Sequence, residues 1–248
     1  KIYLTNAGKE LYLYSHQIFA VMEDTLDAMA ALRSPDHGFL NVGADTTVGT
    51  YIIPNLLGKF HQTYPAVEIS LAVLNHAPLV DGLSNKRVDI AVMSRVPSTL
   101  PVYSEPFAKN ELVLVAAPTH RLAGSTRIPF AKLAQEHFLL REPESGTRAA
   151  LEATFHEAGY PLQVSMQVGN NSAIKRGAAA GLGIALLSRV ALDMELKTNR
   201  LVILDVEGFP LMRQWHIVHL KDKSLSGTAK AFKAFLRQHV DQDLQQGA

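Results

Sequence analysis

Short apolar runs alternate with helix-like segments from Gly38 onward, and this alternation restricts the chain to an α/β fold. The runs FLNVGA, VEISLAVL and VDIAVMS have the length and composition of strands, whereas TVGTYIIPNLLGKFHQTYP and PLVDGLSNK have the character of helices. Parallel strands require crossover connections of this kind. The sequence therefore predicts a βαβαβ unit that ends near residue 94, followed by another strand at ELVLVAAP.

A second set of the same kind follows. HFLLR, QVSMQVG and GIALLS are predicted strands, TRAALEATFHEAG and SAIKRGAAAG are predicted helices, and a helix around 189–197 precedes the strands LVILDV and QWHIVHL and the helix SGTAKAFKAFLRQHV. We expect an α/β fold of two lobes joined by crossing strands. Lobe I would comprise residues 38–117 and 211–248, and lobe II residues 118–210, with a ligand cleft between them.

A long helix precedes these lobes, from Thr5 as its N-cap to about Arg33, where Pro35 disfavours further helix. Apolar residues recur along it at the alternating spacing of three and four that is typical of a coiled coil. The helix could pack on its own domain instead, but we favour self-association. The predicted dimerisation residues are Leu11, Tyr14, Ile18, Val21 and Leu32.

Polar residues follow several predicted strands and begin the next helix, where the first backbone N–H groups are free to bind an anion. They are Thr46 and Thr47 after the first strand, Ser145 and Thr147 in the second unit, and Asn170 after a later strand. Helix capping alone would explain each of them. Arg95 and Arg141 end strands, where a guanidinium can bind a carboxylate or phosphate or form a surface ion pair. Together they favour a site for a small anion.

The composition and motifs argue against other classes of function. The chain has no Cys and a net charge of +1, so it predicts no thiol chemistry and no basic surface for nucleic acid. Gly181 and Gly183 precede a strand, unlike the glycines of a dinucleotide-binding turn, and His216 and His219 point to opposite faces of a strand. We expect no catalytic residue, no metal, no resident cofactor and no membrane span.

Several segments resemble LysR-type transcriptional regulators. IYLTNAGKELYLYSHQI is similar to the end of the winged DNA-binding domain and the start of the linker helix in that family. GFLNVGADTTVGTYIIPNLLGKFHQTYP, LVDGLSNKRVDIAVM and GAAAGLGIALLSR resemble three segments of its effector-binding domain. Two of these segments, TNAGKELYLYS and GTYIIPNLLGKFHQTYP, further resemble the branch that controls Calvin-cycle carbon-fixation operons.

The resemblance implies a two-lobe, type II periplasmic-binding-protein-like fold preceded by a linker helix in residues 1–37. It implies a cytoplasmic dimer or tetramer that binds DNA through an N-terminal winged helix-turn-helix missing from this sequence. The effector would be an anionic metabolite, such as a phosphorylated compound or NADPH. The implied ligand contacts are Thr46, Thr47, Asn75, Arg95, Arg141, Ser145, Thr147 and Asn170. A transporter's solute-binding protein, which shares this fold, is the alternative.

Overall fold

The computed structural model describes residues 4–31 and 37–246, which form two units. Unit 1 comprises the described chain up to Phe107 and again His216–Asp241, and unit 2 comprises Ala108–Trp215 and the described residues from Gln242 onward. Two long strands, β4 (Val102–Ala116) and β9 (Leu211–Leu220), each contribute residues to both units. The predicted α/β class is confirmed.

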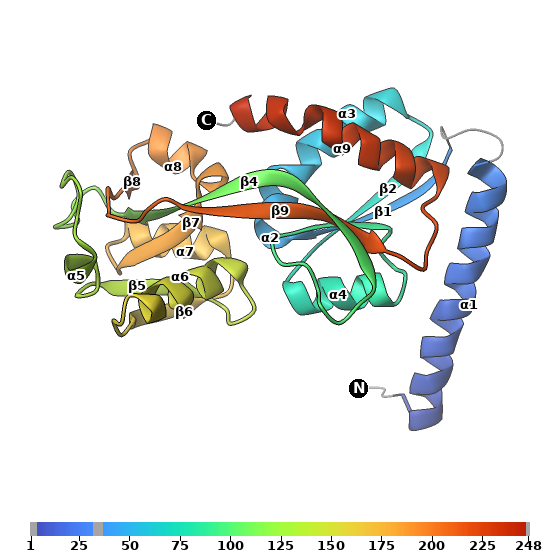
Figure 1. The fold of residues 1–248 in the computed structure, drawn as a ribbon, viewed down its shortest axis with the longest axis horizontal. Coiled ribbons are helices and arrows are strands. Elements are labelled where there is room, and N and C mark those ends of the chain that lie inside the picture. Colours follow the sequence, from blue (N-terminus) through green and yellow to red (C-terminus); the bar gives the residue numbers. More distant parts are fainter. Residues whose placement is uncertain (1–3, 32–36, 247–248) are drawn as a thin grey trace. The chain divides into compact units, whose positions relative to one another are not determined.

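Unit 1 begins with a long helix and continues as a parallel sheet (Figure 1). Its elements are α1 (Asn6–Ala31), β1 (Gly38–Asp45), α2 (Thr46–Tyr51), α3 (Ile53–Thr63), β2 (Val67–Leu74), α4 (His76–Ser84), β3 (Ile90–Met93) and α9 (Gly227–Gln246). β1 pairs in parallel with β2 and with β3, and β3 pairs antiparallel with β9. Parallel strands of this kind end at one edge of the sheet, which is where polar loop residues can gather.

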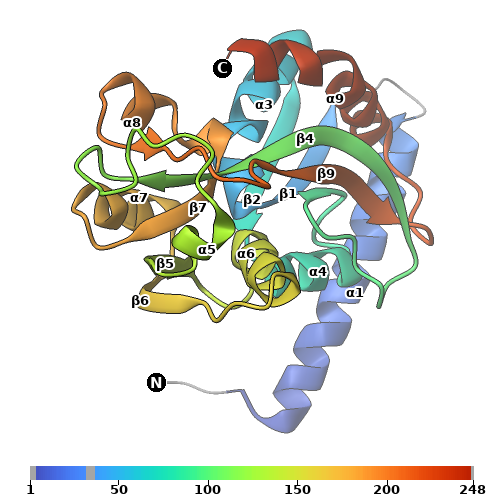
Figure 2. The same cartoon turned by 60° about the vertical axis from the view of Figure 1, so that its left-hand side comes forward.

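Helices cover both faces of this sheet (Figures 1 and 2). On one face α4 packs on β3 and β9 through a cluster that includes Leu79, Met93 and Val218. On the other face the ring of Phe60 in α3 packs edge-on against that of Phe232 in α9, with centroids 5.1 Å apart. The sheet is therefore buried on both sides, as a parallel sheet requires.

Unit 2 repeats this plan. Its elements are α5 (Phe130–Leu133), β5 (His137–Arg141), α6 (Gly146–Glu157), β6 (Gln163–Val168), α7 (Asn171–Ala179), β7 (Ile184–Ser188), a 3₁₀ turn (Arg189–Ala191), α8 (Asp193–Lys197) and β8 (Val202–Ile203). β5 pairs in parallel with β6 and β7, and β7 pairs antiparallel with β4. Two apolar clusters flank this sheet, one containing Phe138 and Phe155 and the other Leu139 and Ile174.

Most predicted elements are confirmed, and the errors have physical causes. The single helix predicted over TVGTYIIPNLLGKFHQTYP is wrong, because the helix breaks at Ile52 and α3 starts at Ile53 with Pro54 in its first turn. Pro lacks the N–H that a continuous helix would need there. β4 starts at Val102, ten residues before the apolar run, because its first half is largely exposed and so lacks an apolar signal. The short helix α5 and the break within 189–197 were not predicted.

The borders of the units fall inside β4 and β9, whereas the sequence analysis placed the lobe borders after residues 117 and 210. A continuous strand has no change in composition where it passes from one unit to another. The assignment of functional roles to these lobes stays a prediction.

Gly43 offers a test of the close packing of β1. A Cβ at this position would collide with the Leu79 side chain and lie 3.0 Å from Cγ1 of Val88. We expect Gly43→Ala to destabilise the chain by about 1–3 kcal/mol, because an overpacked core must shift. Gly58, inside α3, has open space around it. Gly58→Ala should stabilise by about 0.4–1 kcal/mol. Denaturant unfolding measures both, and equal effects would contradict the packing of β1.

Candidate functional site

The carboxyl ends of β1 and β3 are joined by the side chain of Asp45. Its Oδ2 accepts hydrogen bonds from the backbone N–H of Ser94 at 2.6 Å and from the Ser94 hydroxyl at 2.7 Å. The two residues meet because β1 and β3 are parallel neighbours in register, with Ala44 opposite Val92. Asp45 thereby fixes the loop that follows β3, which carries Arg95.

The electrostatic environment of Asp45 is mixed. Burial raises the pKa of its carboxyl above the ordinary value, whereas the two hydrogen bonds from Ser94 and the charges of His76 and Arg95 act in the opposite direction. A partly buried carboxylate with cationic neighbours accepts hydrogen bonds, and an anion can bind beside it only where those cations balance its charge.

The unit 1 residues predicted to bind ligand follow the carboxyl ends of β1, β2 and β3. Thr47 is buried at the start of α2, Thr46 is half-buried, and Arg95 is exposed directly after Ser94. Asn75 is the N-cap residue of α4, and its side chain makes no capping hydrogen bond. The carboxyl ends of β1, β2 and β3 thus carry hydroxyl, amide and guanidinium groups at one edge of the unit 1 sheet.

In unit 2 the guanidinium of Arg141, at the end of β5, is buried and already engaged. Its Nε and Nη2 donate to the two carboxylate oxygens of Glu142 at 2.8 and 2.7 Å, and Nη1 donates to Oδ1 of Asn171. The side chain keeps 2% exposure. A ligand at this position would therefore compete with these internal partners.

The other predicted residues of unit 2 surround the starts of two helices. Ser145 is buried at the N-cap of α6 without a side-chain capping bond, and Thr147 is half-buried in the first turn. Asn170 is exposed and caps α7, because its Oδ1 accepts from the N–H of Ala173 at 2.8 Å. The capping alternative therefore holds for Asn170. That the residues of both units share one ligand stays a prediction.

The predicted dimerisation residues of α1 are exposed in the chain as described. Leu11 is 68% exposed and Ile18 is 66% exposed, and Tyr14 and Val21 are also exposed. Leu32 lies outside the described residues. α1 begins as predicted, with the Thr5 hydroxyl accepting from the N–H of Gly8 at 3.1 Å. Self-association through these residues stays a prediction.

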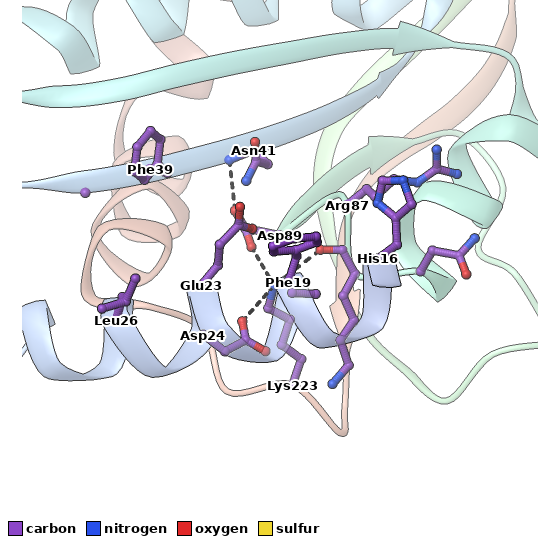
Figure 3. A pocket seen from close by; sticks show the side chains of 14 residues that line it. His16, Phe19, Glu23, Asp24, Leu26, Phe39, Asn41, Arg87, Asp89 and Lys223 are labelled. Atoms are coloured by element: carbon purple, nitrogen blue, oxygen red, sulfur yellow. Dashed lines mark hydrogen bonds and ion pairs between the residues drawn. The ribbon is translucent and has the colours of Figure 1, made fainter. Parts of the chain in front are cut away.

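A pocket lies at a different place in unit 1, between α1 and the start of β1 (Figure 3). It is lined by His16, Phe19, Ala20, Glu23, Asp24, Leu26, Gly38, Phe39, Asn41, Asn85, Lys86, Arg87, Asp89 and Lys223. These residues belong to the end of the sheet opposite Asp45, since Asn41 and Asp89 come before the strand residues that lead to Asp45 and Ser94. None of the predicted ligand contacts lines it.

Sequence reasoning missed Ser94 as a site residue and did not pair it with Asp45. A signal was present, because both residues directly follow buried apolar runs and parallel strands end at the same sheet edge. It also missed Glu142, which neutralises Arg141 from the next position in the chain.

Two α/β units, each with parallel strands and one antiparallel strand shared with the other, define the class of two-lobe ligand-binding proteins. The LysR substrate binding domain model matches residues 33–241. The chain therefore belongs to this family and is the effector-binding part of a LysR-type transcriptional regulator.

Curated relatives match almost the whole chain. The RuBisCO operon transcriptional regulator of Allochromatium vinosum is 38% identical over 236 residues, which cover 95% of this chain and 78% of that protein. The HTH-type transcriptional activator CmpR of Synechocystis sp. is 37% identical over 239 residues, covering 96% of this chain and 78% of the relative. These relatives are regulators of transcription, which sets aside the solute-binding alternative.

Solved structures agree with this assignment. The CcmR regulatory domain of Synechocystis PCC6803 in complex with 2-PG is 37% identical and superposes with a TM-score of 0.79, covering 82% of this chain and 98% of that domain. The effector binding domain of QuiR, at 22% identity and a TM-score of 0.74, shares the fold. The predicted type II periplasmic-binding-protein-like fold is confirmed. Across the described residues, no helix is both long enough and apolar enough to cross a membrane.

The environment of Asp45 predicts a pH-dependent effect of its replacement. Because the folded-state pKa is raised, Asp45 contributes stability that is fully present below its unfolded pKa and is lost as pH rises through the folded pKa. The destabilisation by Asp45→Asn should therefore be larger near about pH 4 than near about pH 7. Denaturant unfolding of both chains at each pH measures this difference. A cost that grows toward pH 7 would contradict the raised pKa of the Asp45 carboxyl.

Proposed function

We propose that this chain binds a small phosphorylated or carboxylate metabolite through the carboxyl ends of its strands, and that this binding regulates transcription. The observation that carries the proposal is its 37% identity with the CcmR regulatory domain, whose solved structure is a complex with 2-PG. The groups at the sheet edge of unit 1 suit the binding of an anion, because Arg95 supplies a positive charge and Thr46 and Thr47 supply hydroxyl donors.

The similarity to regulators of RuBisCO operons supports a role in the control of carbon fixation. We infer that the complete regulator acts in the cytoplasm as an oligomer and binds DNA through an N-terminal winged helix-turn-helix, as the names of HTH-type relatives suggest. A regulatory role, without catalysis, fits the same relatives.

Calorimetric titration with 2-phosphoglycolate, a small phosphorylated carboxylate, tests the ligand class. We expect Thr47→Val and Arg95→Ala each to weaken binding about tenfold or more, because each removes one donor, and tenfold corresponds to about 1.4 kcal/mol. The matched control is Arg200→Ala, which removes an exposed guanidinium from unit 2 and should leave the affinity unchanged.

Two outcomes argue against the proposal. If the parent chain binds neither 2-phosphoglycolate nor NADPH at millimolar concentration, the anionic ligand class is wrong. If it binds one of them but both variants bind as tightly as the parent, the site lies away from this sheet edge.

The exposed apolar residues of α1 predict self-association. Ile18→Asp combined with Val21→Asp would place two charges in the predicted contact, where their desolvation opposes association. Light scattering should show a fall in molar mass toward that of a single chain. Gln17→Asp, on the same helix at an exposed polar position, controls for added charge. A molar mass that falls equally in the control, or in neither variant, would mean that these residues are not the contact.

A further inference from the structure

Lys223 joins helix α1 to the sheet of unit 1 (Figure 3). Its Nζ lies 2.9 Å from Oδ1 of Asp89, directly before β3, and 3.1 Å from Oδ1 of Asp24 on α1. The other oxygen of Asp89, Oδ2, accepts from the N–H of Asn41 on β1 at 2.8 Å. We call Asp24, Lys223 and Asp89 the Lys223 clamp. Through this one lysine, the long helix is linked to the residue that precedes β3.

The clamp is shielded from water. The side chains of Lys223 and Asp89 are each 10% exposed, and that of Asp24 is 32% exposed. Burial lowers the pKa of Lys223, but Asp89 and then Asp24 outweigh burial and keep this pKa above its ordinary value. Lys223 is therefore charged. The shielded pairs hold α1 in place, while most of the large apolar side chains of the helix remain exposed.

The same two strands carry the clamp at one end and the candidate ligand site at the other. The chain runs from Asp89 in the clamp through β3 to Ser94, which donates hydrogen bonds to Asp45. These five residue steps span about 17 Å at the rise of a strand. The part of β1 from Asn41 to Asp45 runs parallel to this stretch, and hydrogen bonds accepted by the Asp89 and Asp45 side chains join the two segments at both ends.

We propose that β1 and β3 couple ligand binding at the Asp45–Ser94 end to the attachment of α1 through the Lys223 clamp. This inference rests on the proposed ligand site. A ligand held beside Ser94 and Arg95 changes the position or the rigidity of the loop after β3, and the strand transmits that change to Asp89. The helix that carries the predicted dimer contact is then held more or less firmly.

The close packing of β1 and β3 favours transmission of a change at the loop after β3 along the strands to Asp89. All four residues of β3 are buried, and β1 beside it has no room for a Cβ at Gly43. Closely packed interiors contain few voids, so they are hard to compress and they transmit strain. Coupling between two sites is also reciprocal, so releasing the helix must alter the affinity for the ligand by the factor with which the ligand alters the helix attachment.

Asp24→Asn is the sharpest variant, because it removes one of the two negative charges and leaves Lys223 paired with Asp89 inside the unit. Lys223→Met, in contrast, leaves Asp89 without a counter-charge and can destabilise the fold. Lys230→Met, at an exposed position on α9, is the matched control. Hydrogen exchange of the α1 amides, with and without 2-phosphoglycolate, and calorimetric titration are measured on each chain.

In the parent, we expect the ligand to change the exchange rates of α1. In Asp24→Asn, these rates should rise about tenfold without ligand, equivalent to about 1.4 kcal/mol, and should no longer respond to ligand. The ligand affinity should change about threefold or more, whereas Lys230→Met should match the parent. If Asp24→Asn leaves the exchange rates and the affinity as in the parent, the coupling is wrong.

A parent chain that binds no ligand would overturn the proposed function and the coupling together. The role of the clamp in holding α1 can still be tested separately, because the faster hydrogen exchange of α1 expected in Asp24→Asn requires no ligand. Exchange in that variant equal to the parent would show that Asp24 does not hold the helix.

Discussion

β1 and β3 are parallel neighbours, and their register decides which polar residues meet at each end of unit 1. With Val42 opposite Ile90 and Ala44 opposite Val92, Asp45 reaches Ser94 at the carboxyl ends, and Asp89 reaches Asn41 at the other ends. A shift by one residue would exchange the side chains that face the two helix layers and would separate these polar pairs. The candidate ligand site and the attachment of α1 therefore depend on this one strand pairing.

The elements could be predicted from the sequence largely because their apolar runs are buried on both faces. Thr46 and Arg95 could be placed at the sheet edge for the same reason, since each follows such a run. The pairing of Lys223 with Asp89 could not be predicted, because the two residues lie 134 positions apart and neither belongs to a motif. The exposed start of β4 gave no apolar signal either.

The two candidate arginines differ in whether their charge is already neutralised within the chain. Arg141 is buried against Glu142 and Asn171, so a ligand would have to replace strong internal bonds. Arg95 is exposed, and its neighbour Asp45 is held by Ser94. An anion in unit 1 therefore depends on Arg95 and the threonine hydroxyls to offset the charge of Asp45. The family resemblance alone assigned both arginines the same role as ligand contacts.

We propose that a small anion binds at the carboxyl ends of β1 and β3. Amide chemical shifts of the isotope-labelled chain, followed by NMR during titration with 2-phosphoglycolate, test it most directly. We expect the largest shifts at Thr46, Thr47, Ser94 and Arg95, with smaller changes at Asp89 and along α1. Saturable shifts confined to other parts of the chain, with these amides unchanged, would contradict it.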